Sequence, residues 1–412
     1  MGLNIAIIGG GAAGFFAAIT ARQADPSAEV TLFEKNRRVL AKVSVTGGGR
    51  CNLTNTFDEV TDLKQVYPRG YNLMKRLFRQ FDHHDAWQWF EDRGVALVAQ
   101  SDQCVFPRSQ DASSIINCLV GEARRLGVGI VTGRRLTRIV TEPDGRLTLH
   151  FQEGGSQTFD RVAVTTGGSP RTEGLHYLET LGHSLVPSVP SLFTFNISDR
   201  RFTALMGTVV EQAIVSLPST RLTASGPLLI THWGMSGPAV LKLSSHAAPL
   251  LRDHDYRMAV AVNWVGETSR SEVEAQLADM AAAHPHRQLG TQRPYALPVR
   301  LWQYILEKTG LPAGKPWAEL GKKGMNKLIE TLTHDLYHTA GKATCREEFV
   351  TCGGVGLDNI DYNTLESKRC PNLYFAGEVL DVDAVTGGFN LQAAWTMGYV
   401  VGQHIANTPG HE

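Results

Sequence analysis

The sequence predicts an α/β fold with a parallel sheet that is interrupted by a long inserted region. A short apolar run, a glycine-rich turn and an alanine-rich stretch open the chain, and a similar succession closes it at 372–405. Between them the pattern turns β-rich near residue 191 and helical near residue 267. At 412 residues the chain is too long for one ordinary core. A pattern that returns at the end indicates that the two ends fold together around a guest region.

These changes of pattern predict three regions. The first combines 1–190 with 353–412 and carries the parallel sheet. The second is β-rich and combines 191–266 with 339–352, and residues 267–338 form a helical insert within it.

The expected elements follow from hydrophobic periodicity and turn residues. A strand at 3–8, a helix at 12–24 and a strand at 29–34 form an opening β-α-β unit. The rest of the first region is expected to hold a helix at 112–126, strands at 128–131, 134–140, 146–151 and 161–165, and a strand, loop and helix across 372–405. The middle is expected to hold strands at 193–197, 213–216, 227–231, 256–264 and 348–351, and helices within 269–338.

Charge and cysteine usage narrow the class of protein. Forty Lys and Arg residues balance forty Asp and Glu residues, so no bulk attraction to nucleic acid or to a membrane is expected, although a local basic patch is compatible with this balance. None of the six cysteines forms a C-x-x-C pair, which is typical of reduced thiols and gives no sign of a metal site. No stretch reaches the roughly 18 apolar residues of a membrane span. We therefore expect a cytoplasmic protein without metal, membrane or nucleic acid partner.

The opening turn has the G-x-G-x-x-G pattern of a Rossmann-like, dinucleotide-binding unit. Gly9 allows the tight turn, Gly11 lets a pyrophosphate approach the backbone, and Gly14 lets the helix pack closely on the strand. The N–H groups at the helix start, around Ala12 and Ala13, direct a positive dipole at the phosphates. A glycine-rich turn without a ligand is the alternative, so the context of the pattern matters.

Glu34 supplies part of that context. It ends the second strand, where a carboxylate accepts hydrogen bonds from ribose hydroxyls. A carboxylate also disfavours a 2′-phosphate, which favours FAD or NAD over NADP. The cations that follow, Lys35, Arg37 and Arg38, weaken this preference.

The C-terminal segment separates FAD from NAD. An apolar strand ends in Gly377 and Glu378, and the loop 386–390 leads into a helix near Leu391. In FAD folds of the two-dinucleotide type, the strand-end acid binds the ribityl or pyrophosphate side. The helix start faces the flavin pyrimidine edge, where its dipole stabilises the negative charge of reduced flavin. An ordinary strand, turn and helix is the alternative.

A third glycine cluster, at 46–49, follows soon after Glu34. Its glycines let the backbone lie against a flat ring or a phosphate, and Arg50 is expected to pair with the pyrophosphate. Cys51 is a candidate redox thiol, but it has no partner nearby in the sequence, and packing beside the flavin is the favoured interpretation.

Together these segments resemble the bacterial YhiN/BaiN-like FAD-dependent oxidoreductases, a family that includes aminoacetone oxidase. The resemblance spans nearly the whole chain and is carried by IAIIGGGAAG at 5–14, VTGGGRCNLTN at 45–55, THWGMSGPAVLKLS at 231–244 and NLYFAGEVLDVDAVTGGFNLQAAWTMG at 372–398. It implies a two-dinucleotide-binding-type FAD domain interrupted by a β-barrel-like domain, which itself carries a helical insert. One small departure is TTGG at 165–168, where the family has ATGG.

The resemblance also implies which residues contact FAD, Leu136 doing so through its backbone to adenine. The expected contacts are Gly9, Gly11, Ala12, Ala13, Gly14, Glu34, Lys35, Lys42, Gly48, Gly49, Arg50, Cys51, Asn52, Leu136, Thr166, Gly167, Gly377, Glu378, Gly388, Phe389, Asn390 and Leu391.

Catalytic groups are less clearly marked. His232 and Ser236 are candidates on a segment expected to project toward the flavin, with His232 as general base toward an amine; a structural, hydrogen-bonded histidine is the alternative. Asp383, beside the flavin loop, either orients that loop, binds a cationic substrate or caps the turn. Hydride transfer needs only placement over flavin N5, so an obligatory acid or base is not required.

The expected function is hydride transfer between a small-molecule substrate and a non-covalently bound FAD. NADH or NADPH is retained as a transient electron donor, although the chain has no second G-x-G-x-x-G to bind it. One alternative is an oxidase of a small amine such as aminoacetone. Another, of a different class, is an FAD-containing RNA-binding or interaction protein. The sequence leaves the oligomeric state open.

Overall fold

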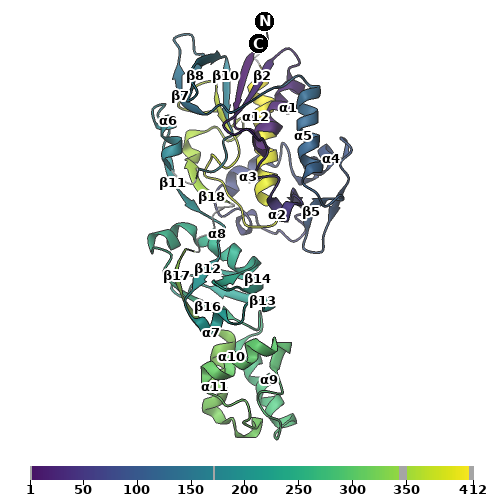
Figure 1. The fold of residues 1–412 in the computed structure, drawn as a ribbon, viewed down its shortest axis with the longest axis vertical. Helices are drawn as coiled ribbons and strands as arrows, with labels where there is room; N and C mark the ends of the chain where they lie inside the picture. Colours follow the sequence, from purple (N-terminus) through teal and green to yellow (C-terminus); the bar gives the residue numbers. More distant parts are fainter. Residues whose placement is uncertain (1, 170–171, 343–349, 408–412) are drawn as a thin grey trace. The chain divides into compact units, whose positions relative to one another are not determined.

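The computed structural model describes residues 2–169, 172–342 and 350–407, and it forms two compact units (Figure 1). Unit 1 combines Met1–Pro190 with Phe349–Glu412, and unit 2 is Ser191–Glu348. The predicted architecture, a Rossmann-like domain interrupted by an inserted region, is confirmed. The return to this domain was expected at residue 353, and this boundary stays a prediction because the residues just before 350 lie outside the described part of the chain. The strand expected at 348–351 lies partly outside the described residues.

A five-stranded parallel sheet forms the centre of unit 1. Its order is β19-β10-β1-β2-β6, and all neighbouring strands run parallel. The strands are β1 (Asn4–Ile8), β2 (Glu29–Glu34), β6 (Gly129–Thr132), β10 (Arg161–Val164) and β19 (Leu373–Phe375). Because the strands are parallel, their carboxyl ends meet at one edge of the sheet, which is where ligands bind in open α/β folds.

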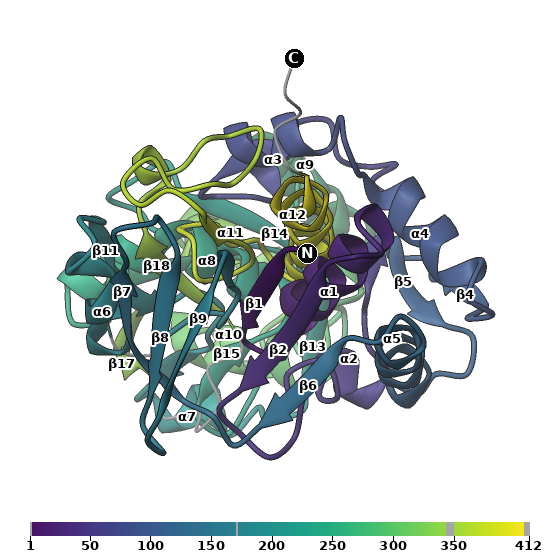
Figure 2. The same ribbon diagram turned by 90° about the horizontal axis from the view of Figure 1, so that it is seen from above.

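Helices and a second sheet cover the central sheet (Figure 2). Helix α1 (Ala12–Ala24) packs against α12 (Phe389–Ala406) and α5 (Ser113–Arg125). The second sheet is an antiparallel meander of β7 (Leu136–Thr141), β8 (Leu147–Phe151) and β9 (Ser156–Phe159). The rings of Phe151 and Phe159 lie 4.9 and 5.8 Å from the ring of Phe33 on β2. Burial on both sides explains why the central strands are continuous apolar runs.

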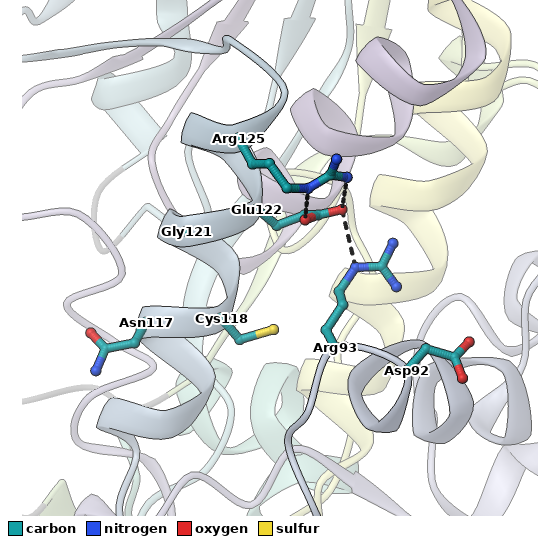
Figure 3. A pocket seen from close by; sticks show the side chains of 7 residues that line it. All are labelled: Asp92, Arg93, Asn117, Cys118, Gly121, Glu122 and Arg125. Atoms are coloured by element: carbon teal, nitrogen blue, oxygen red, sulfur yellow. Dashed lines mark hydrogen bonds and ion pairs between the residues drawn. The ribbon is translucent and has the colours of Figure 1, made fainter.

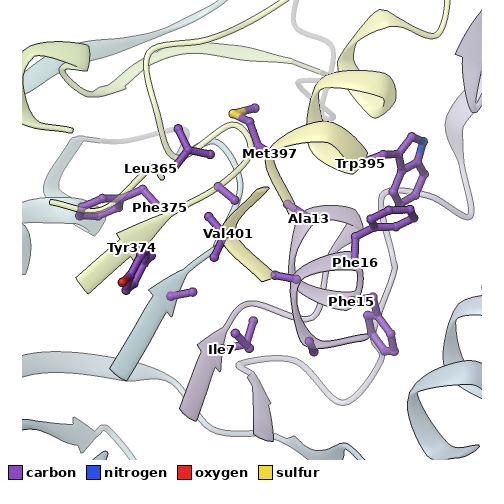
Figure 4. Close-up of a cluster of buried hydrophobic side chains, with 14 of the residues drawn as sticks. Ile7, Ala13, Phe15, Phe16, Leu365, Tyr374, Phe375, Trp395, Met397 and Val401 are labelled. Carbon is purple, nitrogen blue, oxygen red and sulfur yellow. The ribbon is translucent and has the colours of Figure 1, made fainter. Parts of the chain in front are cut away.

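The core of unit 1 lies where α1 and α12 meet the sheet (Figure 4). Phe16 on α1 packs at 5.4 Å from Trp395 on α12, and both side chains are fully buried. Two glycines on α12 allow the close approach of the helices. A Cβ on Gly398 would lie 2.6 Å from the Ala13 carbonyl oxygen, and one on Gly402 would lie 2.4 Å from the Cβ of Thr20. The two helices therefore run side by side in the same direction.

Unit 1 contains further short elements that complete the site and the connection to unit 2. They are α2 (Thr46–Gly49), β3 (Thr54–Asn55), α3 (Tyr71–Leu77), α4 (His83–Glu91), β4 (Leu97–Ala99), β5 (Cys104–Pro107), α6 (His176–Glu179), β11 (Leu185–Pro190) and β18 (Thr351–Val355). Strands β3, β5 and β4 form a small sheet, and β11 pairs antiparallel with β18. The chain leaves unit 1 after β11 and returns before β18.

Unit 2 is built on a closed barrel with the strand order β12-β15-β14-β13-β16-β17. The barrel strands are β12 (Phe195–Ile197), β13 (Val209–Ser216), β14 (Thr223–Ile230), β15 (Gly234–Ser236), β16 (Ala259–Asn263) and β17 (Asp335–Lys342). Its helices are α7 (Arg200–Thr203), α8 (Pro238–Asp253), α9 (Arg270–Ala283), α10 (Val299–Thr309) and α11 (Gly321–Thr333). Helix α8 packs against β14, and the segment α9 to α11 is the helical insert between β16 and β17.

The end of the helical insert in unit 2 differs from the sequence prediction. The helical region was expected to extend to residue 338, but β17 begins at Asp335. The strand alternates in the opposite sense to the usual pattern: Asp335 and Tyr337 are buried, whereas Leu336 is 50% exposed. A polar residue inside and an apolar one outside hide the period of two from a hydrophobicity argument.

Within the described ranges, no helix is long and apolar enough to cross a membrane. The same residues include no group of three His, Cys, Asp or Glu side chains placed to hold a metal ion.

Candidate functional site

The glycine-rich turn lies at the carboxyl edge of β1. Gly9 has φ +118°, and a Cβ there would lie 2.4 Å from the Thr165 carbonyl oxygen. A Cβ on Gly14 would lie 2.0 Å from the Gly9 carbonyl oxygen, so this glycine sets the distance between helix and strand. Gly11 differs from both, because a Cβ there would meet no described atom within 4 Å. Open space lies where the pattern predicts the pyrophosphate, and no described side chain caps the start of α1 at Ala12.

The predicted ribose acid, Glu34, is held by backbone groups. One carboxylate oxygen accepts a hydrogen bond from Gly10 N–H at 2.9 Å, and the other accepts from Asn36 N–H at 2.8 Å. These bonds fix the carboxylate at the edge of the glycine turn while leaving further lone pairs for ribose hydroxyls. Leu136 begins β7 nearby, because Arg134 N–H donates to the Glu34 carbonyl at 2.9 Å. Lys35 is exposed beside them.

The third glycine cluster forms a loop with left-handed backbone. Gly47, Gly48 and Gly49 all have positive φ, and a Cβ on Gly48 would meet no described atom within 4 Å. The Arg50 guanidinium donates to the Gly47 carbonyl at 3.0 Å and lies 4.2 Å over the Phe106 ring. Its expected pairing with the pyrophosphate stays a prediction. Arg50 therefore braces the loop.

Asn52 links this loop to the far end of the chain. Its side-chain nitrogen donates to the Thr54 carbonyl at 3.0 Å and its oxygen accepts from Gly388 N–H at 3.2 Å. A Cβ on Gly388 would lie 2.2 Å from the Thr54 carbonyl oxygen, so only glycine fits there. The two motifs predicted to contact the flavin are therefore in direct contact with one another.

The start of α12 is fixed by its own loop. The Asn390 side chain accepts from Ala384 N–H at 2.9 Å and donates to the Ala384 carbonyl at 2.8 Å. Tyr67 O–H donates to the Phe389 carbonyl at 2.9 Å. Gly388 precedes the helix, and no described side chain caps it. Leu391 lies in the first turn and is partly buried.

Cys51 is unsuited to redox chemistry in this setting. Its side chain is fully buried, and burial raises the pKa of its thiol to about 12. Its backbone is left-handed, with φ +64°. The thiolate, which is the reactive form, is therefore disfavoured near neutral pH.

The ends of β10 and β19 supply the remaining predicted contacts along the same edge. The Thr166 Cα would lie 2.8 Å from a Cβ on Gly9. Gly167 has φ +75° and open space around it. Gly377, which follows β19, lies against Ala13: a Cβ on Gly377 would come within 3.0 Å of the Ala13 Cβ.

Glu378 connects this edge with the strand that returns from unit 2. One carboxylate oxygen pairs with the Lys42 ammonium at 3.0 Å, and the other accepts from Thr351 N–H at 2.7 Å on β18. Asp381 accepts from Gly353 N–H at 3.0 Å on the same strand. Burial raises the pKa of the Asp381 carboxyl above its usual value. Both acids of this loop therefore hold the backbone of β18.

The catalytic candidates lie in different places. Asp383 is buried and forms a two-pronged ion pair with Arg69, whose second contact, from Nη2 to Oδ2, is 2.5 Å. Its carboxylate is thus occupied by a structural partner. His232 is an exposed residue of unit 2, with its ring 4.4 Å from that of Trp233. Ser236 ends β15, also in unit 2, so neither residue belongs to the unit that carries the glycine turn.

The spacing of the two helix starts suits an extended dinucleotide. Ala13 at the start of α1 lies beside Gly398 of α12. Helix α12 begins nine residues before Gly398, at Phe389, which at 1.5 Å per residue places its N-terminus about 13 Å upstream of Ala13, against the direction in which both helices run. One helix N-terminus is thus available for the phosphates and another for the flavin ring. Together with the open positions at Gly11, Gly48 and Gly167, this arrangement fits FAD.

A surface hollow of unit 1 has a different character (Figure 3). It is a wide depression of about 740 Å³ beside α5. Its two arginines, Arg93 and Arg125, both pair with the Glu122 carboxylate, at 3.3 and 2.8 Å. Because both of its arginines are paired with Glu122 and none of the predicted FAD contacts lines it, we do not assign the cofactor to this hollow.

Comparison with known proteins identifies the family of the chain. Residues 3–404 match the model of the HI0933-like protein Rossmann domain family, and the chain belongs to this family. It is an FAD-dependent oxidoreductase, and the resemblance expected from the sequence is confirmed.

Two relatives match over almost their whole length. The chain is 30% identical, over 98% of its own length and 100% of the relative's, to a 3-dehydro-bile acid delta(4,6)-reductase of Clostridium scindens. It is 28% identical, over 97% of both chains, to the ribosomal RNA dihydrouridine synthase of Escherichia coli K12. Among solved structures, a 3-ketosteroid-delta4-(5alpha)-dehydrogenase from Rhodococcus jostii RHA1 has a TM-score of 0.53 at 15% identity, covering 98% of this chain and 97% of that one. This last likeness concerns the fold alone.

Proposed function

We propose that this flavoprotein reduces a carbon–carbon double bond that is conjugated to a carbonyl group. The observation that carries the proposal is the chemistry common to two near-full-length relatives. The name of one describes reduction of a delta(4,6) bile acid, and the name of the other describes formation of dihydrouridine. A 3-oxo steroid with a Δ4 bond and a uracil ring both present a double bond next to a carbonyl, and both accept a hydride at the carbon β to it.

The residues of unit 1 support this chemistry by holding FAD non-covalently. In our proposal, Gly11 and the start of α1 take the pyrophosphate, Glu34 takes the ribose, and the loop around Gly48 lies along the ring. The N–H groups at the start of α12 stabilise negative charge on the flavin. Bound FAD, once reduced, supplies the hydride. His232 and Ser236 of unit 2 remain candidates for contacts to the substrate.

The electron donor belongs to the same proposal. Reduction of a double bond consumes two electrons and two protons per turnover, and NADH or NADPH is the donor class we propose. Neither needs a dedicated domain if the nicotinamide visits the flavin face only briefly.

The first test is a visible spectrum of the purified protein under anaerobic conditions. NADPH or NADH is expected to bleach the oxidised flavin band, and a 3-oxo-Δ4 steroid added afterwards is expected to restore it with one saturated product per flavin. A flavin that NAD(P)H leaves oxidised, but that aminoacetone bleaches, would replace this proposal with the amine oxidase alternative.

A uracil ring within RNA is the second candidate substrate, and the 28% identity to a ribosomal RNA dihydrouridine synthase favours it. It departs from the small-molecule substrate expected from the balanced charge of the chain. Incubation of the reduced protein with uridine-containing RNA, followed by mass analysis of nucleosides for a gain of two hydrogens, separates the two substrates. A cytoplasmic location, expected from the cysteine pattern, remains part of the proposal.

A further inference from the structure

A group of cations is concentrated at one end of the carboxyl edge of the sheet. Lys35, Arg37 and Arg38 follow β2, and Arg134 and Arg135 follow β6. The two loops lie side by side, because Gly133 N–H donates to the Asn36 carbonyl at 3.1 Å and Arg134 N–H to the Glu34 carbonyl at 2.9 Å. Figure 2 shows β2 and β6 ending next to each other. We call these five residues the basic loop pair.

Few negative charges compensate the basic loop pair. Lys35, Arg37, Arg38 and Arg135 are exposed, and within the described part of the chain none of the five cations forms an ion pair. Two carboxylates, Glu34 and Glu153, lie among them, so five cations face two negative charges, and Glu153 also attracts Arg134 and Arg135. Glu34 accepts from Gly10 and Asn36 N–H, and Glu153 accepts from Arg135 N–H at 3.0 Å.

FAD accounts for at most one of these cations, because Lys35 alone among the five is an expected FAD contact. Its two phosphates are expected at Gly11 and the start of α1, whereas the loops lie beyond Glu34, the acid expected on the ribose. The adenosine end of FAD carries no further phosphate. An acid at Glu34 also argues against a 2′-phosphate at that position. The exposed guanidinium groups are therefore available to an anion outside the cofactor.

We propose that the basic loop pair binds the phosphate backbone of an RNA. Three of its four exposed cations, Arg37, Arg38 and Arg135, are arginines, whose planar groups bind phosphate oxygens through paired hydrogen bonds. The Arg134 guanidinium is already engaged, because it donates to the Gly154 carbonyl at 3.1 Å and lies 4.4 Å over the Phe151 ring. Adjacent exposed cations on two neighbouring loops suit a polyanion with successive phosphates better than one isolated phosphate. The inference rests on the second substrate proposed above, a uracil ring in RNA, and adds the surface that would hold such a substrate. Charge balance over the whole chain conceals this surface, because the compensating acids lie elsewhere.

The test measures RNA binding by the flavin-loaded protein. The probe is a short, labelled, uridine-containing single-stranded RNA, and its fluorescence anisotropy is recorded across a series of salt concentrations. The variant Arg37→Gln/Arg38→Gln/Arg135→Gln is compared with wild type. For single strands the slope of log affinity against log salt is about 0.7 per phosphate contact, so each lost contact is expected to weaken binding roughly fivefold near 0.1 M salt. Three contacts correspond to roughly a hundredfold loss and a slope shallower by about 2.

The matched control is Lys322→Gln/Lys323→Gln, an exposed pair at the start of α11 in unit 2. It is expected to keep wild-type RNA affinity, and both variants are expected to keep full flavin content and steroid enone reduction. Equal affinity and slope in wild type and the triple variant would overturn the proposal, as would an equal loss in the control. A triple variant that loses affinity for NADPH but not for RNA would assign the loops to a nucleotide phosphate instead. RNA binding is measured without turnover, so the two proposals fail separately. Loss of the RNA-binding proposal would leave the proposed double-bond reduction intact, and an absence of double-bond reduction would not change how the RNA-binding result is interpreted.

Discussion

Single glycines in the opening turn have separable tasks. Gly14 is required by the protein itself, because any side chain there would overlap the Gly9 carbonyl. Gly11 has φ −93°, a value that alanine also adopts, and it faces open space. The pattern of three glycines thus combines a packing requirement with a ligand requirement, and the two can be tested apart.

Gly11→Ala is expected to fold normally and to lose FAD. A methyl group at this position occupies the space proposed for the pyrophosphate, while the folded chain gains about 0.4–1 kcal/mol from reduced backbone freedom in the unfolded state. The measurements are the flavin-to-protein absorbance ratio and the melting temperature of the apoprotein. Gly14→Ala is the comparison and is expected to lose both flavin and stability. Full flavin content in the Gly11 variant would contradict the proposed phosphate position.

Cys51→Ala is expected to leave flavin reduction unchanged. The thiol pKa of about 12 keeps Cys51 protonated at any pH at which the protein is assayed. Burial raises the pKa of the Cys51 thiol above its ordinary value near 9, so the contribution of this protonated thiol to stability is complete below about pH 9. It is lost as pH rises from there towards 12, and no limb of a neutral-range profile belongs to Cys51. The check is the pH profile of the rate of flavin bleaching by NAD(P)H. A limb between about pH 7 and 9 that disappears in the variant would restore a redox role.

Asp383→Asn is expected to destabilise the protein more than it slows the reaction. Removing the carboxylate leaves the Arg69 guanidinium without its partner in a site where the side chain is 16% exposed, and breaking a buried pair costs about 3–5 kcal/mol. Urea unfolding measures this loss, and the rate per bound flavin measures catalysis. Unchanged stability with a rate lowered more than tenfold would instead support the catalytic role considered from the sequence.

At the level of residues, the sequence predicted positions that depend on neighbouring residues. It did not predict contacts between residues that are far apart in the chain. Positions such as Gly9 and Glu34 could be assigned from strand, turn and spacing alone. The partners of Arg50 and Asp383 could not, because Phe106 and Arg69 lie tens or hundreds of residues away and reach them only through the folded chain.

Among the elements, the close packing of α1 on α12 matters most for the site, because the starts of both helices belong to it. Gly398→Ala is expected to force these helices apart, because its Cβ would lie 2.6 Å from the Ala13 carbonyl oxygen. Overpacking costs about 1–3 kcal/mol, partly offset by the better helix propensity of alanine, about 1 kcal/mol. The free energy of unfolding, measured with denaturant, and the affinity for FAD are both expected to decrease. Gly121→Ala on α5, where a Cβ meets no described atom within 4 Å, is the control and should be neutral or stabilising.

Helices and strands whose apolar residues follow a regular period were predicted well. Those whose apolar residues depart from that period were not. The first three elements match their predicted ranges to within one residue because apolar runs and turn residues agree. Helix α8 was not predicted, since Pro249 inside it breaks the usual pattern. Strand β17 was hidden by its buried Asp335, whose carboxylate accepts from Trp264 Nε1–H at 3.0 Å, a partner that the sequence cannot reveal.

At the scale of the molecule, two units with separate cores predict two unfolding transitions. FAD contacts only unit 1 in our proposal, so saturating FAD is expected to raise one transition and leave the other in place. A ligand at about 100 times its Kd adds about 2.7 kcal/mol to the unit that binds it. Calorimetry of the apoprotein and the FAD-loaded protein measures both. A single transition that shifts as a whole would mean that the two cores unfold as one cooperative system.

The interruption of unit 1 also sets an order of events during synthesis. Residues 191–348 leave the ribosome before β19 and α12 exist, so the barrel has all of its strands while the central sheet still lacks its last strand and α1 lacks its partner helix. Domains fold largely as their residues emerge. The contact of Gly388 with Thr54 therefore forms only after the inserted unit has been made, and a growing chain cannot complete its flavin site until α12 has been translated. Cofactor loading thus reports that synthesis has passed the inserted unit and reached α12.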